Sequence, residues 1–138
     1  MTAAMPGEVK AKFDTDPAQV KPKLQALRKL ILSLGEAEGI SPLKEILKWG
    51  EPSYVAPMGS TIRLDWKENL PGTFSIYFIC STRLVDTYRE VYPDVFEFDG
   101  NRALGSELED TLPLAPLKHC LRMTLRDHEV KHLPLVGA

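Results

Sequence analysis

The sequence predicts a two-layer α+β sandwich, in which a predominantly antiparallel sheet packs against N- and C-terminal helices. Two segments near the ends of the chain repeat apolar residues at helical spacing, and two central segments alternate apolar with polar residues. Each helix or strand of this kind has one apolar face to bury, so the elements must pack as layers. With 138 residues, the chain has the usual length of a single domain, and we expect one domain over 1–138.

The first helix is indicated by apolar residues three and four positions apart: Val20, Leu24, Leu27, Ile31 and Leu34. Pro22 lacks an amide donor, so the regular part begins near Lys21 or the helix kinks there, and Gly35 marks its end. Residues 1–16 form a polar lead with no defined element. Pro42 and the apolar residues Leu43, Ile46 and Leu47 then predict a short capped helix, which Gly50 and Pro52 stop.

Strands are predicted at 61–66 and 73–80, joined by the turn-rich segment 67–72 and paired antiparallel. Alternation places Ile62, Leu64 and Trp66 on one face of the first strand, opposite Arg63 and Asp65. A helix capped by Ser81 or Thr82 is expected to run to about Val91. A hairpin follows around Asp99-Gly100-Asn101, then a loop over 105–113 and a last helix from Leu114 to about His132.

Composition excludes several classes of function. No stretch approaches the length of a membrane span, and no apolar run near the N-terminus resembles a signal peptide, so we expect a cytoplasmic protein without membrane association. Net charge is −2, and residues 51–110 carry eleven acids against five bases, which disfavours nucleic-acid binding. Cys80 and Cys120 are expected to be buried thiols. A homodimer would be ordinary for a domain of this size.

His128-Glu129-Val130-Lys131-His132 matches the H-E-x-x-H zinc pattern, which leaves a metal-dependent hydrolase as one alternative. The six residues after His132 supply no third ligand, however, and His128 continues the apolar stripe of its helix. We therefore assign no metal site and no catalytic residue. His119 and Cys120 are neighbours on a helix and point apart, which argues against a dyad.

Acidic side chains gather in the second half of the chain and suit hard cations: Asp94, Glu97, Asp99, Glu107, Glu109 and Asp110. They lack the spacing of a calcium loop, and a solvated acidic face explains them as well. We expect no cofactor.

The segment LKWGEPSY, Leu47 to Tyr54, combines two aromatic rings, a carboxylate, a glycine and a proline at a predicted helix-to-strand transition. Such loops often line a pocket for a small molecule or a partner's side chain. The candidate binding residues are Trp49, Glu51, Tyr54, Arg63 and Tyr77. The alternative is a rigid corner, in which Trp49 plugs the core.

The chain resembles the YdhG-like family, small bacterial domains of unknown function whose recurring segment is K-W-G-x-P-x-Y, here Lys48 to Tyr54. The similarity extends from about Leu24 onward, through TIRLDWK, YFICSTRLVDTYRE, FDGNRA, LKHC and KHLPLVG. The resemblance implies helices packed against an antiparallel sheet, and it suggests comparison with frataxin-like iron proteins. Frataxins concentrate acids on the first helix, whereas residues 17–35 here carry four bases and no acid.

These observations favour a non-enzymatic binding or accessory domain with its pocket beside LKWGEPSY. Weak iron binding for delivery and a metal-dependent hydrolase remain the alternatives.

Overall fold

The computed structural model describes residues 5–40, 42–57, 59–69, 71–78, 83–100, 103–107 and 113–127. Over these residues the chain forms helices α1 (Gly7–Thr15), α2 (Lys21–Ala37), α3 (Leu84–Val91) and α4 (Leu114–Leu125). Six strands form one antiparallel sheet of order β1-β2-β3-β4-β6-β5. Their bounds are β1 Lys44–Lys48, β2 Glu51–Val55, β3 Ile62–Asp65, β4 Thr73–Tyr77, β5 Glu97–Asp99 and β6 Ala103–Glu107.

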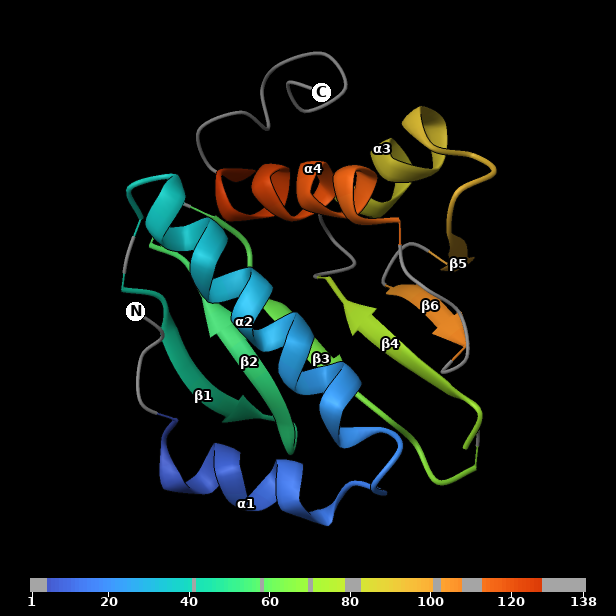
Figure 1. Cartoon of the computed structure of the whole chain (residues 1–138). Helices are drawn as coiled ribbons and strands as arrows, with labels where there is room; N and C mark the ends of the chain where they lie inside the picture. Colours follow the sequence, from blue (N-terminus) through green and yellow to red (C-terminus); the bar gives the residue numbers. More distant parts are fainter. Residues whose placement is uncertain are drawn as a thin grey trace.

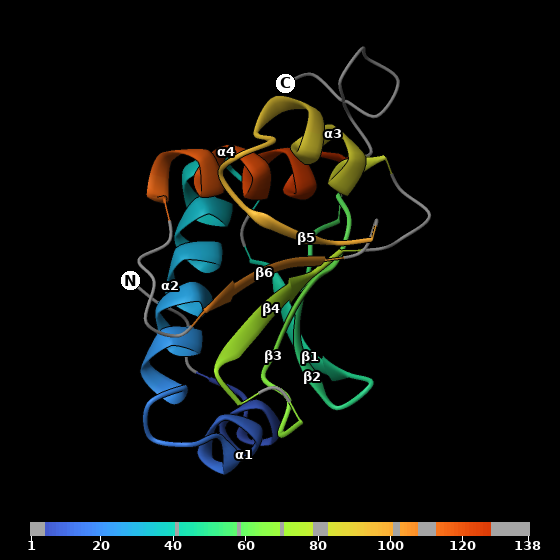
Figure 2. The same ribbon diagram turned by 90° about the vertical axis from the view of Figure 1, so that its right-hand side faces the viewer.

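The helices and the sheet form two layers, which confirms the predicted α+β sandwich. Helix α2 crosses one face of the sheet, α1 lies at one end, and α4 with α3 lies at the other (Figure 1). Seen from the side, no helix of the described residues covers the opposite face (Figure 2). We call that opposite face the open face of the sheet.

Helix α2 carries the predicted apolar stripe into the core. Val20, just before the helix, and Leu24, Ile31 and Leu34 are all at most 7% exposed. The helix runs past Gly35, its predicted end, to Ala37. Gly35 therefore lies inside the helix and does not end it. A Cβ at this position would sit 3.0 Å from Cγ of Leu43, so the glycine makes room for Leu43 to pack against the helix.

Helix α1 replaces the polar lead that the sequence suggested for residues 1–16. Val9 and Phe13, one turn apart, are fully buried on its inner face, and the rest of the helix is polar apart from Gly7 and Ala11. Only two apolar side chains mark the core-facing side of α1, too few to produce a visible helical period.

The predicted short helix after Pro42 is wrong, because Lys44–Lys48 is strand β1 and pairs antiparallel with β2. Trp49 and Gly50 have φ angles of 56° and 73°, so the two residues between the strands adopt the tight turn typical of hairpins. Segment 47–54 is therefore a β-hairpin rather than a helix-to-strand corner. Pro52 fits in β2 because it lies beyond the described pairing of β2 with β3, where no amide donor is needed.

The central strands confirm the predicted alternation. Ile62 and Leu64 of β3, with Phe74 and Ile76 of β4, are buried on the side facing α2. Strands β5 and β6 form the predicted hairpin around Gly100, whose φ is 54°. Strand β6 continues to Glu107, so the loop expected from residue 105 is wrong there. The sequence pattern did not indicate this part of the strand, because Gly105 and Ser106 are not apolar.

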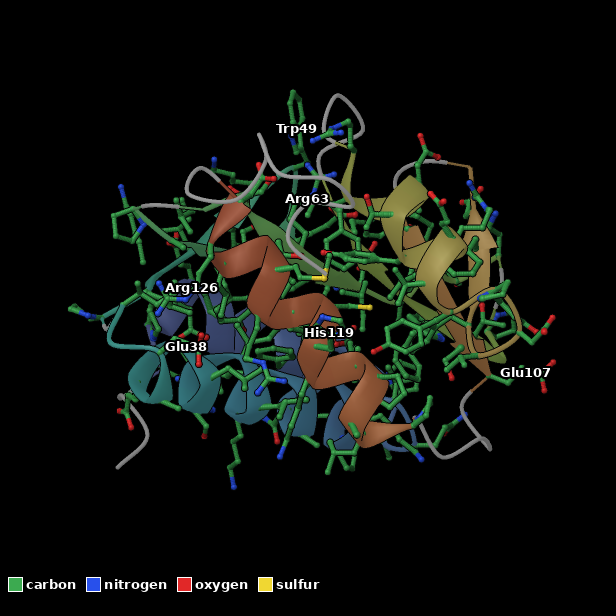
Figure 3. The ribbon with its side chains drawn as sticks, turned by 90° about the horizontal axis from the view of Figure 1, so that it is seen from above. Glu38, Trp49, Arg63, Glu107, His119 and Arg126 are labelled. Carbon is green, nitrogen blue, oxygen red and sulfur yellow. The ribbon has the colours of Figure 1, made fainter. Side chains whose placement is uncertain are left out.

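Helix α4 is held by polar contacts to α3 and α2. The hydroxyl of Tyr88 donates to the carbonyl oxygen of Cys120 at 2.7 Å, and that of Tyr92 lies 2.6 Å from Nδ1 of His119. At the other end, Nε of Arg126 donates to Oε1 of Glu38 at 2.9 Å (Figure 3). No helix within the described ranges is long and apolar enough to cross a membrane.

Candidate functional site

The open face of the sheet gathers charged side chains from β2 and β3. Arg63 is paired in register with Ser53 of β2 and with Tyr77 of β4, so these three side chains share one face. Glu51 and Asp65, each two residues along its strand, project on the same side. We call Glu51, Arg63, Asp65, Lys67 and Tyr77 the open-face cluster.

Glu51 forms ion pairs with both cations of the cluster. Its Oε1 lies 3.2 Å from Nε of Arg63, and its Oε2 lies 3.7 Å from Nζ of Lys67. Burial raises the pKa of Glu51 above 4.5, and the negative charge of Asp65 raises it further, while Arg63 and Lys67 lower it. The carboxyl therefore holds its proton more tightly than an exposed glutamate does.

Tyr77, which is only 8% exposed, places its ring close to both cations. Its ring centroid lies 5.8 Å from Cζ of Arg63 and 5.7 Å from Nζ of Lys67, within the range of cation–π attraction. Lys67 also donates to Oδ2 of Asp65 at 2.9 Å, and this bond is the main reason that the pKa of Lys67 is raised. Lys67 therefore stays charged near neutral pH.

The cluster continues toward α1 through Lys12. Its Nζ lies 3.5 Å from Oδ1 of Asp65 and 3.2 Å from Oδ1 of Asp16. Burial is the main reason that the pKa of Asp16 is raised, and Oδ2 of Asp16 is buried without a hydrogen-bond partner among the described residues. Lys12 thus ties the first helix to the charged strands.

Exposure differs sharply between the two signs of charge. The side chains of Lys67 and Arg63 are 49% and 25% exposed, whereas those of Glu51 and Asp65 are 13% and 9% exposed. A molecule that approaches the open face therefore meets the cations first, and the carboxylates beneath orient them.

Of the predicted binding residues, the structure brings together Glu51, Arg63 and Tyr77. Tyr54 lies on the other face, fully buried, next to an ion pair in which Nε of Arg28 donates to Oε2 of Glu45 at 2.6 Å. Burial and the charge of Glu45 raise the pKa of Tyr54 well above its usual value. Tyr54 is thus part of the tie between α2 and the β1–β2 hairpin, and it is remote from the open face.

Trp49 is neither a core plug nor a lining residue of the open-face cluster. It sits at the tip of the β1–β2 hairpin with 88% of its surface exposed, so the predicted rigid corner with a buried tryptophan is wrong. Figure 3 shows its ring pointing away from the protein, on the same side of the sheet as Arg63 and opposite α2.

The other candidate chemistry finds little support in the described residues. No group of three or more histidine, cysteine, aspartate or glutamate side chains is placed to hold a metal ion within the ranges that the structure covers. His128, Glu129 and His132 lie outside those ranges, as do Cys80, Glu109 and Asp110. Cys120 is fully buried, which raises the pKa of its thiol to about 12 and makes it a poor nucleophile.

Sequence reasoning missed four members of the charged network: Lys12, Asp16, Asp65 and Lys67. Asp65 was placed on the polar face of its strand together with Arg63, and this pairing was a usable signal. Lys67 follows two residues later, after β3 ends. Lys12 and Asp16 had no local signal, because they reach the cluster only through the packing of α1.

Comparison of the chain with protein-family models, with curated proteins and with solved structures finds no match. The resemblance to the YdhG-like family therefore stays a prediction, and the geometry of the described residues alone carries the functional argument.

Proposed function

We propose that this protein is a non-enzymatic binding domain, and that its open-face cluster holds a small ligand through an anionic group such as a carboxylate or phosphate. The observation that carries the proposal is the arrangement of Arg63 and Lys67. Two cations flank one aromatic ring, 5.8 and 5.7 Å from its centroid, and each is oriented from beneath by a carboxylate.

The donors of these cations support binding of an anion. Arg63 pairs with Glu51 through Nε, and a guanidinium carries further N–H donors on its terminal nitrogens that can bond a ligand. An arginine beside a lysine can contact the oxygens of one carboxylate or phosphate from two directions, and charge-assisted bonds of this kind are stronger than neutral ones. Tyr77 is only 8% exposed, so its ring supports the two cations through cation–π attraction and leaves the ligand contacts to them.

The test is titration of the protein with inorganic phosphate and with succinate, followed by calorimetry and by amide chemical shifts. We expect saturable binding with shifts centred on residues 51, 63, 67 and 77. Arg63→Gln and Lys67→Gln should each weaken binding by about tenfold, because each removes charged hydrogen bonds.

The matched controls are Arg122→Gln and Lys29→Gln, which remove exposed cations of the same types from α4 and α2. They should leave the affinity unchanged. No saturable binding of either anion, or an equal loss in the controls, would show that the open-face cluster is a structural ion network alone.

A further inference from the structure

We infer that the outer edge of strand β1 is a docking site for an extended acidic segment of a partner protein, which adds to the sheet as a further strand. The inference is independent of the open-face cluster. It depends on three properties of the β1–β2 hairpin: an edge strand, a pair of lysines on it, and an exposed tryptophan at its end.

Strand β1 is one border of the sheet, with β2 as its only paired neighbour in the described strand order. In a hairpin closed by a two-residue turn, the residues flanking the turn, Lys48 and Glu51, exchange hydrogen bonds, and the pattern repeats at every second residue. The backbone groups of Glu45 and Leu47 therefore point outward. No backbone bond to them from beyond the hairpin is present in the part of the chain that the structure describes.

The side chains of β1 define what kind of strand fits there. Lys44, Ile46 and Lys48 alternate onto one face, and both lysines are exposed. An added strand with acidic residues four positions apart and an apolar residue midway would match them by cross-strand pairing. Self-association through β1 is disfavoured, since two antiparallel copies centred on Ile46 would place Lys44 against Lys48 at both ends.

Trp49 extends this surface beyond Lys48. A tryptophan with φ of 56° occupies a left-handed conformation that favours asparagine or glycine, and at 88% exposure no packing within the described residues compensates for it. Large exposed aromatic residues of this kind dominate the affinity of many protein interfaces. A strand that continues past Lys48 reaches the Trp49 ring.

The test uses the whole chain and a capped heptapeptide of sequence TDTVTDT, with TKTVTKT as the charge-reversed probe. We expect TDTVTDT to bind and to protect the amides of Glu45 and Leu47 from hydrogen exchange. In Lys44→Glu/Lys48→Glu, the preference should reverse toward TKTVTKT, with a change of about tenfold for each peptide, because two cross-strand pairs change sign.

Trp49→Asn should weaken binding of TDTVTDT by about threefold or more while the protein stays folded, because it removes the aromatic anchor. TDTVTDT methylated on alternate backbone nitrogens should not bind. The inference is overturned if the methylated peptide binds equally, since charge attraction would then suffice. It is also overturned if the two amides gain no protection, if the protein dimerises through β1, or if vesicles containing phosphatidylserine bind through Trp49 while TDTVTDT does not.

Discussion

Three carboxylates and three cations interlock between α1 and the open face of the sheet, and burial affects the acids most. Asp16 and Glu51 both have a raised pKa, and in each case burial is the largest cause. A group that binds its proton more tightly in the folded state stabilises the fold under acid conditions. These two side chains therefore favour the native state less as the pH rises.

Asp16→Asn should remove that dependence for one of the two groups. Because the folded pKa of Asp16 is raised, the native state binds more protons than the unfolded state between pH 3.8 and the raised value. The contribution of Asp16 to the free energy of unfolding of the wild type thus falls with rising pH in this window. In denaturant unfolding at several pH values, the free energy of unfolding of the variant should increase relative to that of the wild type as the pH increases. A difference independent of pH would contradict the assignment.

The Arg28–Glu45 pair differs from Asp16 and Glu51, because its two side chains form a direct ion pair inside the protein. Nε and Nη2 of Arg28 donate to the two carboxylate oxygens of Glu45 at 2.6 and 2.9 Å, and both side chains are 6% exposed. Their geometry is bidentate, the strongest arrangement for such a pair.

Arg28→Met should destabilise the protein by about 3–5 kcal/mol, because it leaves the carboxylate of Glu45 buried without its partner. The double variant Arg28→Met/Glu45→Leu should recover most of that loss, since no uncompensated charge then remains. Urea unfolding of the wild type, both single variants and the double variant measures the coupling. Additive single effects would show that the two charges act independently.

At the level of elements, the β1–β2 hairpin is where sequence reasoning failed most clearly. Leu43, Ile46 and Leu47 have helical spacing, and Pro42 resembles a helix start, so local pattern favoured a helix. The hairpin formed instead because pairing with β2 joins Glu45 and Tyr54 into one register beneath α2. In this register Glu45 also bonds Arg28 of α2, and a contact between residues so far apart in the sequence cannot be predicted from a short segment.

Trp49→Asn should raise the free energy of unfolding by about 1 kcal/mol, because asparagine tolerates the left-handed backbone that this turn requires. The exposed ring gives up no core packing when it is removed. Trp49→Phe is the control and should match the wild type, as it keeps an aromatic residue in the same strained conformation. Destabilisation of the asparagine variant would indicate that the indole has a packing role.

For the whole molecule, the sequence predicted the layers and the central strands correctly, because β3, β4, α2 and α4 each carry a clear apolar period. It also named Arg63 and Tyr77 as candidate binding residues, and the structure pairs them in register. What it could not supply was the assembly of the charged network, in which Lys12 of α1 reaches Asp65 of β3. Such contacts depend on how layers pack rather than on local pattern.

The segment after β2 packs tightly against the end of α4. The amide of Ser60 donates to the carbonyl oxygen of Thr124 at 2.9 Å, and Gly59 lies against the same turn. A Cβ on Gly59 would meet the backbone of Leu125 and approach the carbonyl oxygen of Thr124 to 2.6 Å. The atoms in the way belong to the helix backbone, which cannot move aside as a flexible side chain can.

Gly59→Ala should therefore destabilise the protein by about 2 kcal/mol or more, through displacement of α4 from the sheet. Gly72→Ala is the matched control, because a Cβ there meets nothing within 4 Å. Thermal and denaturant unfolding of the two variants gives the comparison. Equal stabilities would mean that the contact between this segment and α4 relaxes freely.

The exposed position of Trp49 also gives the protein a natural optical reporter. The two tryptophans occupy unlike surroundings: the Trp49 indole is in water, whereas Trp66 is half-buried and donates from Nε1 to the carbonyl oxygen of Pro71 at 3.0 Å. Iodide should quench the fluorescence of Trp49 far more than that of Trp66. The fraction of tryptophan fluorescence that iodide quenches therefore reports changes at the hairpin tip, without any added label.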